Sequence, residues 1–166
     1  MSDLSITNAR LSIRNAQAGD VRHILGFIKE LADFEKLSHQ VVADETQLEK
    51  TLFTGDAVAK VLIAELDGEA VGFALYFYNY STFLAKPGLY LEDLYVTPSA
   101  RGEKVGKSLL KKLAQIAVAE NCGRVEWSVL DWNQSAIDFY RSVGAVGMEE
   151  WTVQRLDGEA LTLFAG

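Results

Sequence analysis

The chain has very little cysteine, very little histidine and no long apolar run. Its one cysteine, Cys122, excludes an internal disulfide and fits a reducing, cytoplasmic setting. No set of His, Cys and acidic residues has the spacing of metal ligands, so we expect no metal. Charges interrupt every stretch that could span a membrane, and the first ten residues lack the basic and apolar regions of a signal peptide. These absences favour a cytoplasmic protein.

An excess of positive charge is also lacking. The formal net charge is −7, which argues against general nucleic-acid binding and is compatible with a cationic partner. The length of 166 residues, with 49% apolar and 23% charged residues, is that of an ordinary globule with a real core. We therefore expect a single domain over residues 1–166.

Periodicity predicts strands interleaved with helices, which together indicate a mixed α/β sheet. Capping residues place helix starts at Asp20, at Asp44 with Gln47 as a capping box, and at Asn133. The pentapeptide LDGEA occurs twice, and its Asp-Gly pairs predict hairpin turns at 67–68 and 157–158. Strands are predicted at 11–14, 59–66, 70–80, 89–96 and 125–129. One further helix is predicted to run from about residue 105 to about residue 123, and the helix that starts at Asn133 is predicted to end near residue 144.

The segment LEDLYVTPSARGEKVGKSLLKKL, residues 91–113, carries most of the functional signal. A strand ends at Thr97-Pro98, a glycine-containing loop follows, and a helix begins with Val105, Leu109 and Leu113 on one face. Residues 101–112 hold five cations against one anion. A glycine loop that leads into a helix N-terminus, where the N–H groups lack partners, attracts phosphate. A solvated basic helix face is the alternative interpretation.

The letters GEKVGKS also suggest a P-loop, and the apolar run ending at Asp131 suggests its acidic strand. That motif needs four residues between the first glycine and the Gly-Lys pair, whereas this loop has three. A shortened loop would not cradle phosphates, so we do not favour a nucleoside triphosphatase.

The loop instead resembles the acetyl-CoA-binding motif of the GNAT acetyltransferases, Arg/Gln-x-x-Gly-x-Gly/Ala. The matching residues are Arg101, Gly102, Glu103, Lys104, Val105 and Gly106, with Lys104 in place of the first glycine. The segments IKELADFE, LYLEDLYV, ARG and DWNQSAIDFYRSVGA resemble the diamine and thialysine N-acetyltransferases in the same order, over about residues 11–164. The resemblance implies the GNAT fold, a mixed and mostly antiparallel central sheet flanked by helices.

The resemblance also implies how acetyl-CoA is held and how the reaction runs. The strand at 89–96 would bulge and splay, so that backbone near Leu94 and Val96 binds the pantetheine arm, while the amides from Gly102 to Lys107 take the pyrophosphate. Asn133 would contact CoA. Tyr140 would protonate the leaving thiolate, since an ordinary phenol is protonated at neutral pH. Glu92 would take a proton from the amine through water, or would attract the cationic amine while solvent takes the proton. Strict alternation places Glu92 on the face of Leu94 and opposite Asp93 and Tyr95.

The amine site is implied by acidic and aromatic residues that match the family. Glu35, Glu92, Asp93, Glu149 and Trp151 are its predicted members. The family's lysine and tyrosine before Glu35 are Asp33 and Phe34 here, and two residues of its polyamine loop are Ser81 and Phe83. Polyamines, thialysine and lysine-like amino acids all stay open as substrates.

The sequence and its resemblance to this family therefore predict a cytoplasmic N-acetyltransferase that transfers acetyl from acetyl-CoA to a small primary amine by direct attack in a ternary complex, and the resemblance implies a homodimer. A protein lysine or N-terminal acetyltransferase and a non-catalytic CoA- or amine-binding regulatory domain are the alternatives. We further predict right-handed helical geometry at Lys104, with its ammonium near a CoA phosphate.

Overall fold

The computed structural model describes residues 6–7 and 10–166. The chain divides into two compact units, one up to Ser128 and one from Val129 onward, which are described separately below. Seven of the first ten residues, over which no signal peptide is predicted, lie outside the described residues. The single-domain organisation stays a prediction.

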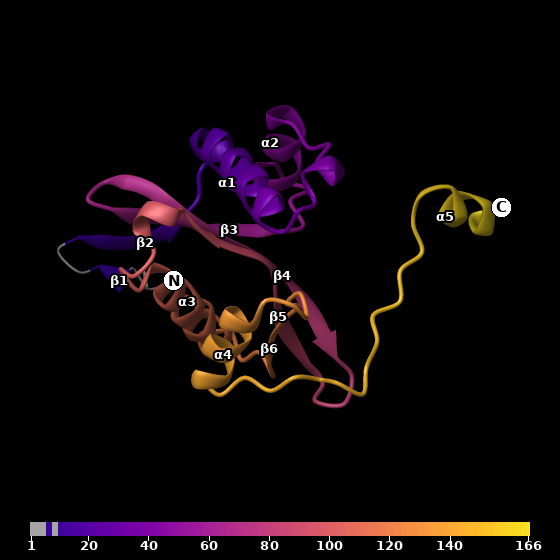
Figure 1. Ribbon diagram of the computed structural model, residues 1–166. Coiled ribbons are helices and arrows are strands. Elements are labelled where there is room, and N and C mark those ends of the chain that lie inside the picture. Colours follow the sequence, from indigo (N-terminus) through magenta and orange to yellow (C-terminus); the bar gives the residue numbers. More distant parts are fainter. Residues whose placement is uncertain (1–5, 8–9) are drawn as a thin grey trace. The chain divides into compact units, whose positions relative to one another are not determined.

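The first unit is built on a six-stranded sheet whose strands are neighbours in chain order (Figure 1). Every neighbouring pair is antiparallel except the last, which is parallel. The predicted mixed and mostly antiparallel sheet is therefore confirmed. The strands are β1 (Ile6–Thr7), β2 (Leu11–Asn15), β3 (Lys60–Leu66), β4 (Glu69–Ser81), β5 (Lys86–Val96) and β6 (Val125–Trp127).

The predicted turn between β3 and β4 is confirmed in detail. Asp67 and Gly68 both have positive φ, 51° and 84°, as a two-residue hairpin of the primed type requires. This turn matches the right-handed twist of its flanking strands, so it fixes the register of the two central strands.

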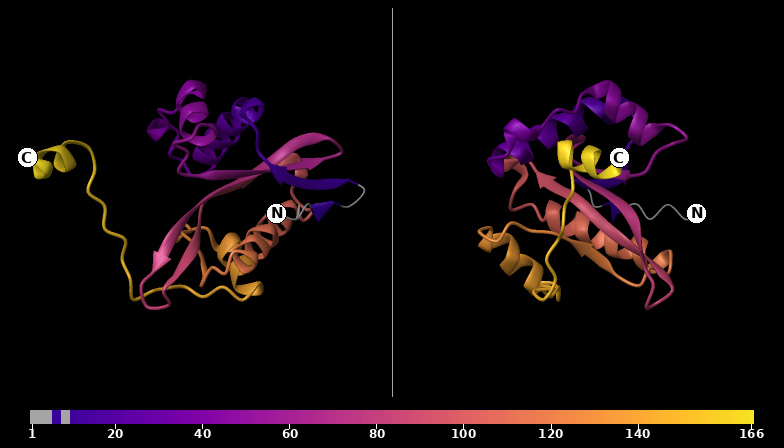
Figure 2. Two further views of the ribbon diagram at one scale, coloured as in Figure 1. Left: turned by 180° about the vertical axis from the view of Figure 1, so that it is seen from behind. Right: turned by 90° about the vertical axis from the view of Figure 1, so that its right-hand side faces the viewer.

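Helices cover both faces of this sheet (Figures 1 and 2). On one face, α1 (Val21–Phe34) and α2 (Glu45–Phe53) pack through Ile24, Phe27 and Leu48 onto Phe73 and Tyr95. On the other face, α3 (Val105–Ala119) buries Leu109 and Leu113 completely. Three short 3₁₀ turns complete the unit: η1 (Ala18–Asp20), η2 (Ser38–Gln40) and η3 (Pro98–Ala100).

The two predicted N-caps of this unit have different outcomes. Asp44 accepts from Gln47 N at 2.8 Å and Gln47 Oε1 accepts from Asp44 N at 3.0 Å, so the capping box of α2 is confirmed. The predicted capping of α1 by the Asp20 side chain is wrong, because that carboxylate accepts from Gln17 N and from Arg14 instead.

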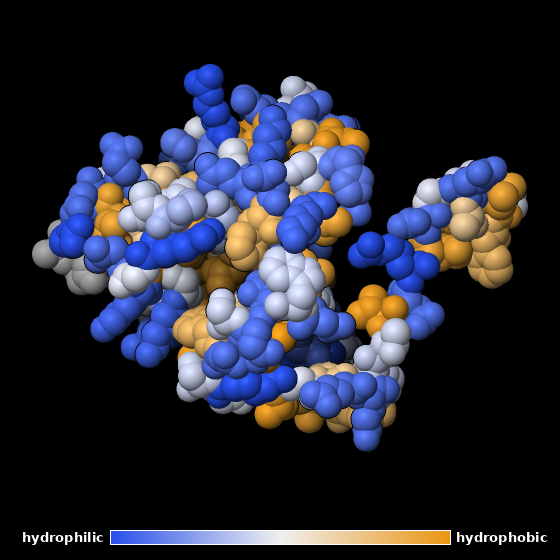
Figure 3. All heavy atoms as spheres, in the orientation of Figure 1, coloured by the Kyte–Doolittle hydropathy of each residue, from blue (hydrophilic) through white to orange (hydrophobic). Residues whose placement is uncertain are grey.

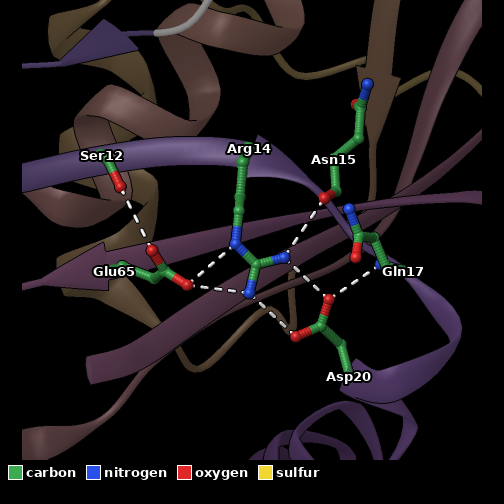
Figure 4. Close-up of polar contacts among 6 residues, drawn as sticks. All are labelled: Ser12, Arg14, Asn15, Gln17, Asp20 and Glu65. Atoms are coloured by element: carbon green, nitrogen blue, oxygen red, sulfur yellow. Dashed lines mark hydrogen bonds and ion pairs between the residues drawn. The ribbon is translucent and has the colours of Figure 1, made fainter. Parts of the chain in front are cut away.

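Figure 4 shows why Asp20 is diverted. Arg14, on β2, forms ion pairs with Asp20 at 2.7 Å and with Glu65, on β3, at 2.8 Å. The hydrogen bond from Arg14 lowers the pKa of the nearly buried Asp20 carboxyl. The network ties the start of α1 to the sheet.

One irregularity in β5 is important for the site. Leu75 of β4 pairs with Asp93 and Tyr76 pairs with Leu91, so Glu92 is an extra residue, a β-bulge. Leu91 and Leu94 thus lie opposite alternate residues of β4 and share a face. The alternation that we predicted across Glu92 is therefore wrong, whereas the bulge implied by the family resemblance is present.

The second unit contains two helices, α4 (Gln134–Ser142) and α5 (Gly158–Ala165). Asn133 caps α4 through a hydrogen bond from Ala136 N at 3.4 Å, as predicted. The hairpin predicted at Asp157-Gly158 is wrong, since these residues begin α5. Apolar side chains are exposed along the segment after α4 and on α5 (Figure 3).

No helix in the described part of the chain is both long enough and apolar enough to cross a bilayer.

Candidate functional site

The loop between β5 and α3 presents backbone N–H groups at a helix start. Gly102 has a φ of 91°, a left-handed conformation that favours glycine, and α3 begins three residues later at Val105. The first N–H groups of a helix have no acceptor inside it, and the helix dipole makes that end positive. Among the described residues, the side chain of Lys104 makes no capping hydrogen bond to these groups. The arrangement fits an anion such as a pyrophosphate.

Lys104 corrects one of our expectations. Its φ of 61° and ψ of 20° place it in the left-handed region, so the predicted right-handed geometry is wrong. The loop therefore keeps the backbone shape for which the motif uses glycine, although the residue is lysine. A non-glycine residue is strained in this conformation, and the conformation is kept because it directs the chain into α3.

Glu103, the one acidic residue of the loop, forms an ion pair with Arg10, which directly precedes β2. Glu103 forms an ion pair with Arg10 at 3.6 Å, and Arg10 also pairs with Asp67 at 2.9 Å. Both pairs are exposed and therefore weak. The carboxylate of Glu103 is nevertheless paired, while Lys104 and Lys107 stand exposed on the same segment.

The outer edge of β5 beyond the bulge has open backbone. The parallel pairing of β5 with β6 ends at Leu91 opposite Trp127, so in the described structure residues 92–96 have no strand partner on that side. Their groups directed away from β4 can therefore bind an extended ligand by adding to the sheet edge. Leu94 and Val96, the predicted pantetheine-binding residues, lie in this stretch. The carbonyl oxygen of Val96 accepts from Arg101 Nε at 3.2 Å.

A pocket of about 140 Å³ lies between the C-terminal half of α1, the segment after it and β5. Two predicted amine-site residues, Glu35 and Asp93, are brought together in it. Burial, then the charges of Glu92 and Glu35, raise the pKa of Asp93 to about 6. Burial also raises the pKa of Glu35. The other lining residues are Ile28, Leu31, Ala32, Leu37, Gln40 and Val41.

Burial in an apolar pocket disfavours the ionised form of both carboxyl groups and so raises their pKa values, and for Asp93 the neighbouring charges of Glu92 and Glu35 add to this effect. A cation placed between the Glu35 and Asp93 carboxyl groups would relieve both effects. The pocket is thus suited to an ammonium group at the end of an apolar stem.

Glu92, the predicted base, is exposed at the bulge rather than buried within the strand. The exposed carboxylate needs no partner to offset burial, which explains how a charge is tolerated here. It lies next to Asp93 in sequence and next to the open strand edge.

The remaining predicted site residues lie in the second unit. Tyr140 is half-buried on α4, with its ring centroid 5.6 Å from that of Phe139, and Asn133 caps the same helix. Glu149 and Trp151 are exposed in the segment after α4. Their participation in one site with the first unit stays a prediction.

Three described residues that sequence reasoning did not connect also meet at the loop. The Arg101 guanidinium carbon lies 5.6 Å from the ring centroid of Phe34 and 5.7 Å from that of Tyr95. We had assigned Arg101 to CoA because of its motif position. The one feature of the sequence that could have indicated this contact is Phe34, the aromatic residue before Glu35, which the sequence analysis gives only as a departure from the family pattern.

The profile of the acetyltransferase (GNAT) family matches residues 25–145, which include the pocket, the open strand edge, the loop and α4. The chain belongs to this family. It is an N-acetyltransferase by its family and its named relatives, and the fold and the resemblance predicted from sequence are confirmed.

Among GNAT relatives, the chain is similar to a thialysine N-epsilon-acetyltransferase of Bos taurus, with 39% identity over 95% of this chain and 99% of that protein. It is 36% identical to an L-ornithine N5-acetyltransferase of Arabidopsis thaliana, over 90% of this chain and 85% of that protein. An integron cassette protein from the mobile metagenome of V. cholerae has a similar structure, with a TM-score of 0.80 and 28% identity over 95% and 99% of the two chains.

Within the described residues, no group of three or more His, Cys, Asp or Glu is placed to hold a metal ion.

Proposed function

We propose that this GNAT protein transfers an acetyl group from acetyl-CoA to the terminal primary amine of a small, cationic, amino-acid-like or polyamine-like substrate. The observation that carries the proposal is the pocket that Glu35 and Asp93 both line, beside the open edge of β5. The anion-binding loop stands at the other end of that edge, so both substrates would meet along one strand.

The residues present fit acetyl-CoA as a cosubstrate. The loop from Arg101 to Lys107 offers backbone N–H groups, a helix N-terminus and lysine side chains to its phosphates. The edge of β5 at Leu94 and Val96, which has no strand partner on that side in the described structure, offers backbone hydrogen bonds to its amide-bearing arm. Acetyl-CoA supplies the activated acyl group, a thioester carbonyl.

The chemistry that this chain's residues would supply is proton transfer and orientation. The amine must lose a proton, which Glu92 takes through water, before its lone pair forms a bond to the carbonyl carbon. A backbone N–H near Leu94 would stabilise the carbonyl oxygen as charge develops. The carbon–sulfur bond then breaks, and Tyr140 gives its phenolic proton to the sulfur.

The pocket and the relatives together favour an acceptor with one terminal amine. Thialysine and ornithine both end in such an amine, and the relatives named for them are 39% and 36% identical to this chain over the aligned residues. The aliphatic wall from Ile28, Leu31 and Leu37 suits a methylene stem. Asp93, ionised by the approach of the ammonium, would complete the ion pair.

A thiol-release assay with a panel of acceptors tests the proposal. We expect turnover with thialysine, ornithine, lysine or spermidine, and little with a lysine-containing peptide. Turnover with the peptide alone would establish a protein acetyltransferase instead. CoA binding without turnover on any acceptor would establish a non-catalytic binding domain.

Tyr140→Phe tests the assignment of the general acid. Turnover should fall about 10²–10⁴-fold, the range for one general acid, while acetyl-CoA affinity changes little. The control is Tyr80→Phe, which removes the hydroxyl of an exposed tyrosine on β4. Normal turnover in Tyr140→Phe, with the chemical step limiting, would exclude the role.

We also propose that the chain forms a homodimer and acts in the cytoplasm. The support for a dimer is the set of exposed apolar side chains in the second unit, including Trp151, Leu163 and Phe164. Exposed apolar surface on this scale marks an interaction site. A reducing location agrees with the single, unpaired Cys122.

A further inference from the structure

The side chain of Arg101 contacts two aromatic rings. Its guanidinium lies over Phe34 and Tyr95, at 5.6 and 5.7 Å from the two centroids, within the range of a cation–π contact. Its Nε donates to the carbonyl oxygen of Val96 at 3.2 Å. The side chain is therefore occupied on the side of α1 and β5.

The two rings belong to elements that build the amine pocket. Phe34 is the last residue of α1, and Glu35, which follows it, lines the pocket. Tyr95 stands two residues after Asp93 on β5. Burial, and then Glu30 one turn before Phe34, raise the pKa of Tyr95, so its hydroxyl stays protonated. Arg101 thus contacts one residue on each of the two elements, α1 and β5, that contribute to the pocket, and each of these residues lies within two positions of a pocket-lining carboxylate.

The backbone at Arg101 belongs to the anion-binding loop. Gly102 and Lys104, both left-handed, follow it directly. An anion held by the N–H groups of this loop would fix its backbone, and the Arg101 side chain would then fix Phe34 and Tyr95. Phe34 is 44% exposed, so its contact with Arg101 is a surface contact that the core does not require.

We propose that Arg101 is a positioning residue that couples occupancy of the loop to the order of the amine pocket, through its contact with Phe34. This inference rests on the proposed function, because it takes the loop as the CoA site. Binding of CoA should raise amine affinity, and by linkage the amine should raise CoA affinity by the same factor. An exposed cation–π contact corresponds to a factor of about two to five.

Amide hydrogen exchange with and without CoA tests the coupling in the full chain. In the natural protein, CoA should slow exchange both at residues 101–107 and at residues 30–37. In Phe34→Leu, which removes the ring but keeps an apolar side chain, protection should remain at 101–107 and be lost at 30–37. Phe34→Tyr keeps the ring and should behave as the natural protein does.

The outcomes separate this inference from the proposed function. Protection at 101–107 without protection at 30–37 in the natural protein would overturn the coupling alone, as would equal protection at 30–37 in Phe34→Leu. Absence of protection at 101–107 would overturn the CoA site and the coupling together. Either Phe34 variant folds if its urea midpoint stays near that of the natural protein.

Kinetics provide a second readout that a purely structural role would not change. Phe34→Leu should raise the KM for thialysine about two- to fivefold when acetyl-CoA is saturating, and reduce the factor by which CoA increases thialysine affinity to about one. Phe34→Tyr should leave both near their natural values. An unchanged coupling factor in Phe34→Leu would contradict the proposal.

Discussion

A lysine in the left-handed conformation starts α3, at the position where the GNAT motif has its first glycine. A side chain in this region costs about 1–2 kcal/mol relative to glycine, and sequence reasoning had no way to weigh that cost against the demands of the loop. The loop shape is set by the junction of β5 and α3, so the backbone is kept and the residue is strained.

Lys104→Gly should therefore have two opposite effects. The free energy of unfolding should rise by about 1 kcal/mol, because glycine adopts this conformation without strain. Acetyl-CoA should bind more weakly at low salt and almost normally at high salt, since the lost ammonium acts through screened charge. Urea unfolding and calorimetric titration at two salt concentrations measure both. Tighter binding at low salt would show that the lysine obstructs the phosphates.

Asp93 is the second residue whose environment could not be predicted from its neighbours in sequence. The prediction of Glu35, Glu92 and Asp93 as an amine site came from family resemblance, and only the folded chain shows Glu35 and Asp93 lining one pocket while Glu92 stays exposed. The distance in sequence between α1 and β5 hides this meeting from any local pattern.

The raised pKa of Asp93 predicts how stability depends on pH. Between about pH 4 and pH 6 the folded chain binds a proton that the unfolded chain has released, so stability falls as pH rises through this window. Asp93→Asn should lack this loss and become more stable than the natural protein by about 1–3 kcal/mol above pH 6. Urea unfolding at several pH values measures the difference. Glu35→Gln is the matched control, and it should lower the Asp93 pKa by removing a neighbouring charge.

At the scale of elements, most of the first unit could be predicted because its signals are local. The hairpin at Asp67-Gly68 and the capping box at Asp44 each depend on a few adjacent residues, and so does the start of α4 at Asn133 in the second unit. The same pentapeptide, LDGEA, makes a hairpin at 66–70 and begins a helix at 156–160. The first copy has strands on both sides to pair, so tertiary context decides the outcome.

Glycine positions give a direct test of the close approach between β4 and β5. A Cβ at Gly72 would lie 2.6 Å from the backbone oxygen of Tyr95, which cannot move without disturbing β5. Gly72→Ala should therefore lower the free energy of unfolding by about 2–3 kcal/mol. Gly26, on the exposed side of α1, has open space where an added methyl group would lie, and Gly26→Ala should raise the free energy of unfolding by about 0.5–1 kcal/mol. Equal effects in urea unfolding would contradict the packing described for β5.

At the scale of the whole molecule, the second unit carries exposed apolar side chains that its own contacts do not cover. Ten large apolar residues from Trp132 to Phe164 are exposed there. Sequence reasoning expected a hairpin at 157–158, which would have hidden some of this surface, and the helix α5 leaves it open. The prediction of a homodimer accounts for its coverage.

The dimer prediction has a measurable form. Sedimentation should give a mass of about twice the 18.3 kDa of one chain. The double variant Trp151→Ser, Leu163→Ser should shift the equilibrium toward the monomer, because it removes apolar area from the proposed interface. Val42→Ser, which changes an equally exposed apolar residue of the first unit, should leave the mass unchanged. A natural chain that sediments as a monomer would contradict the assignment.

The bulge at Glu92 also shifts by one residue the alternation of β5 side chains between the two faces of the sheet. Before it, the odd-numbered residues Leu89 and Leu91 face α3; after it, the even-numbered Leu94 and Val96 do. Loss of one residue elsewhere in the strand would reverse the face to which part of the strand points, and that part would exchange core for surface. Loss of Glu92 itself would preserve every side chain's orientation and remove only the opening toward β6. The strand could thus lose its binding edge without losing its core.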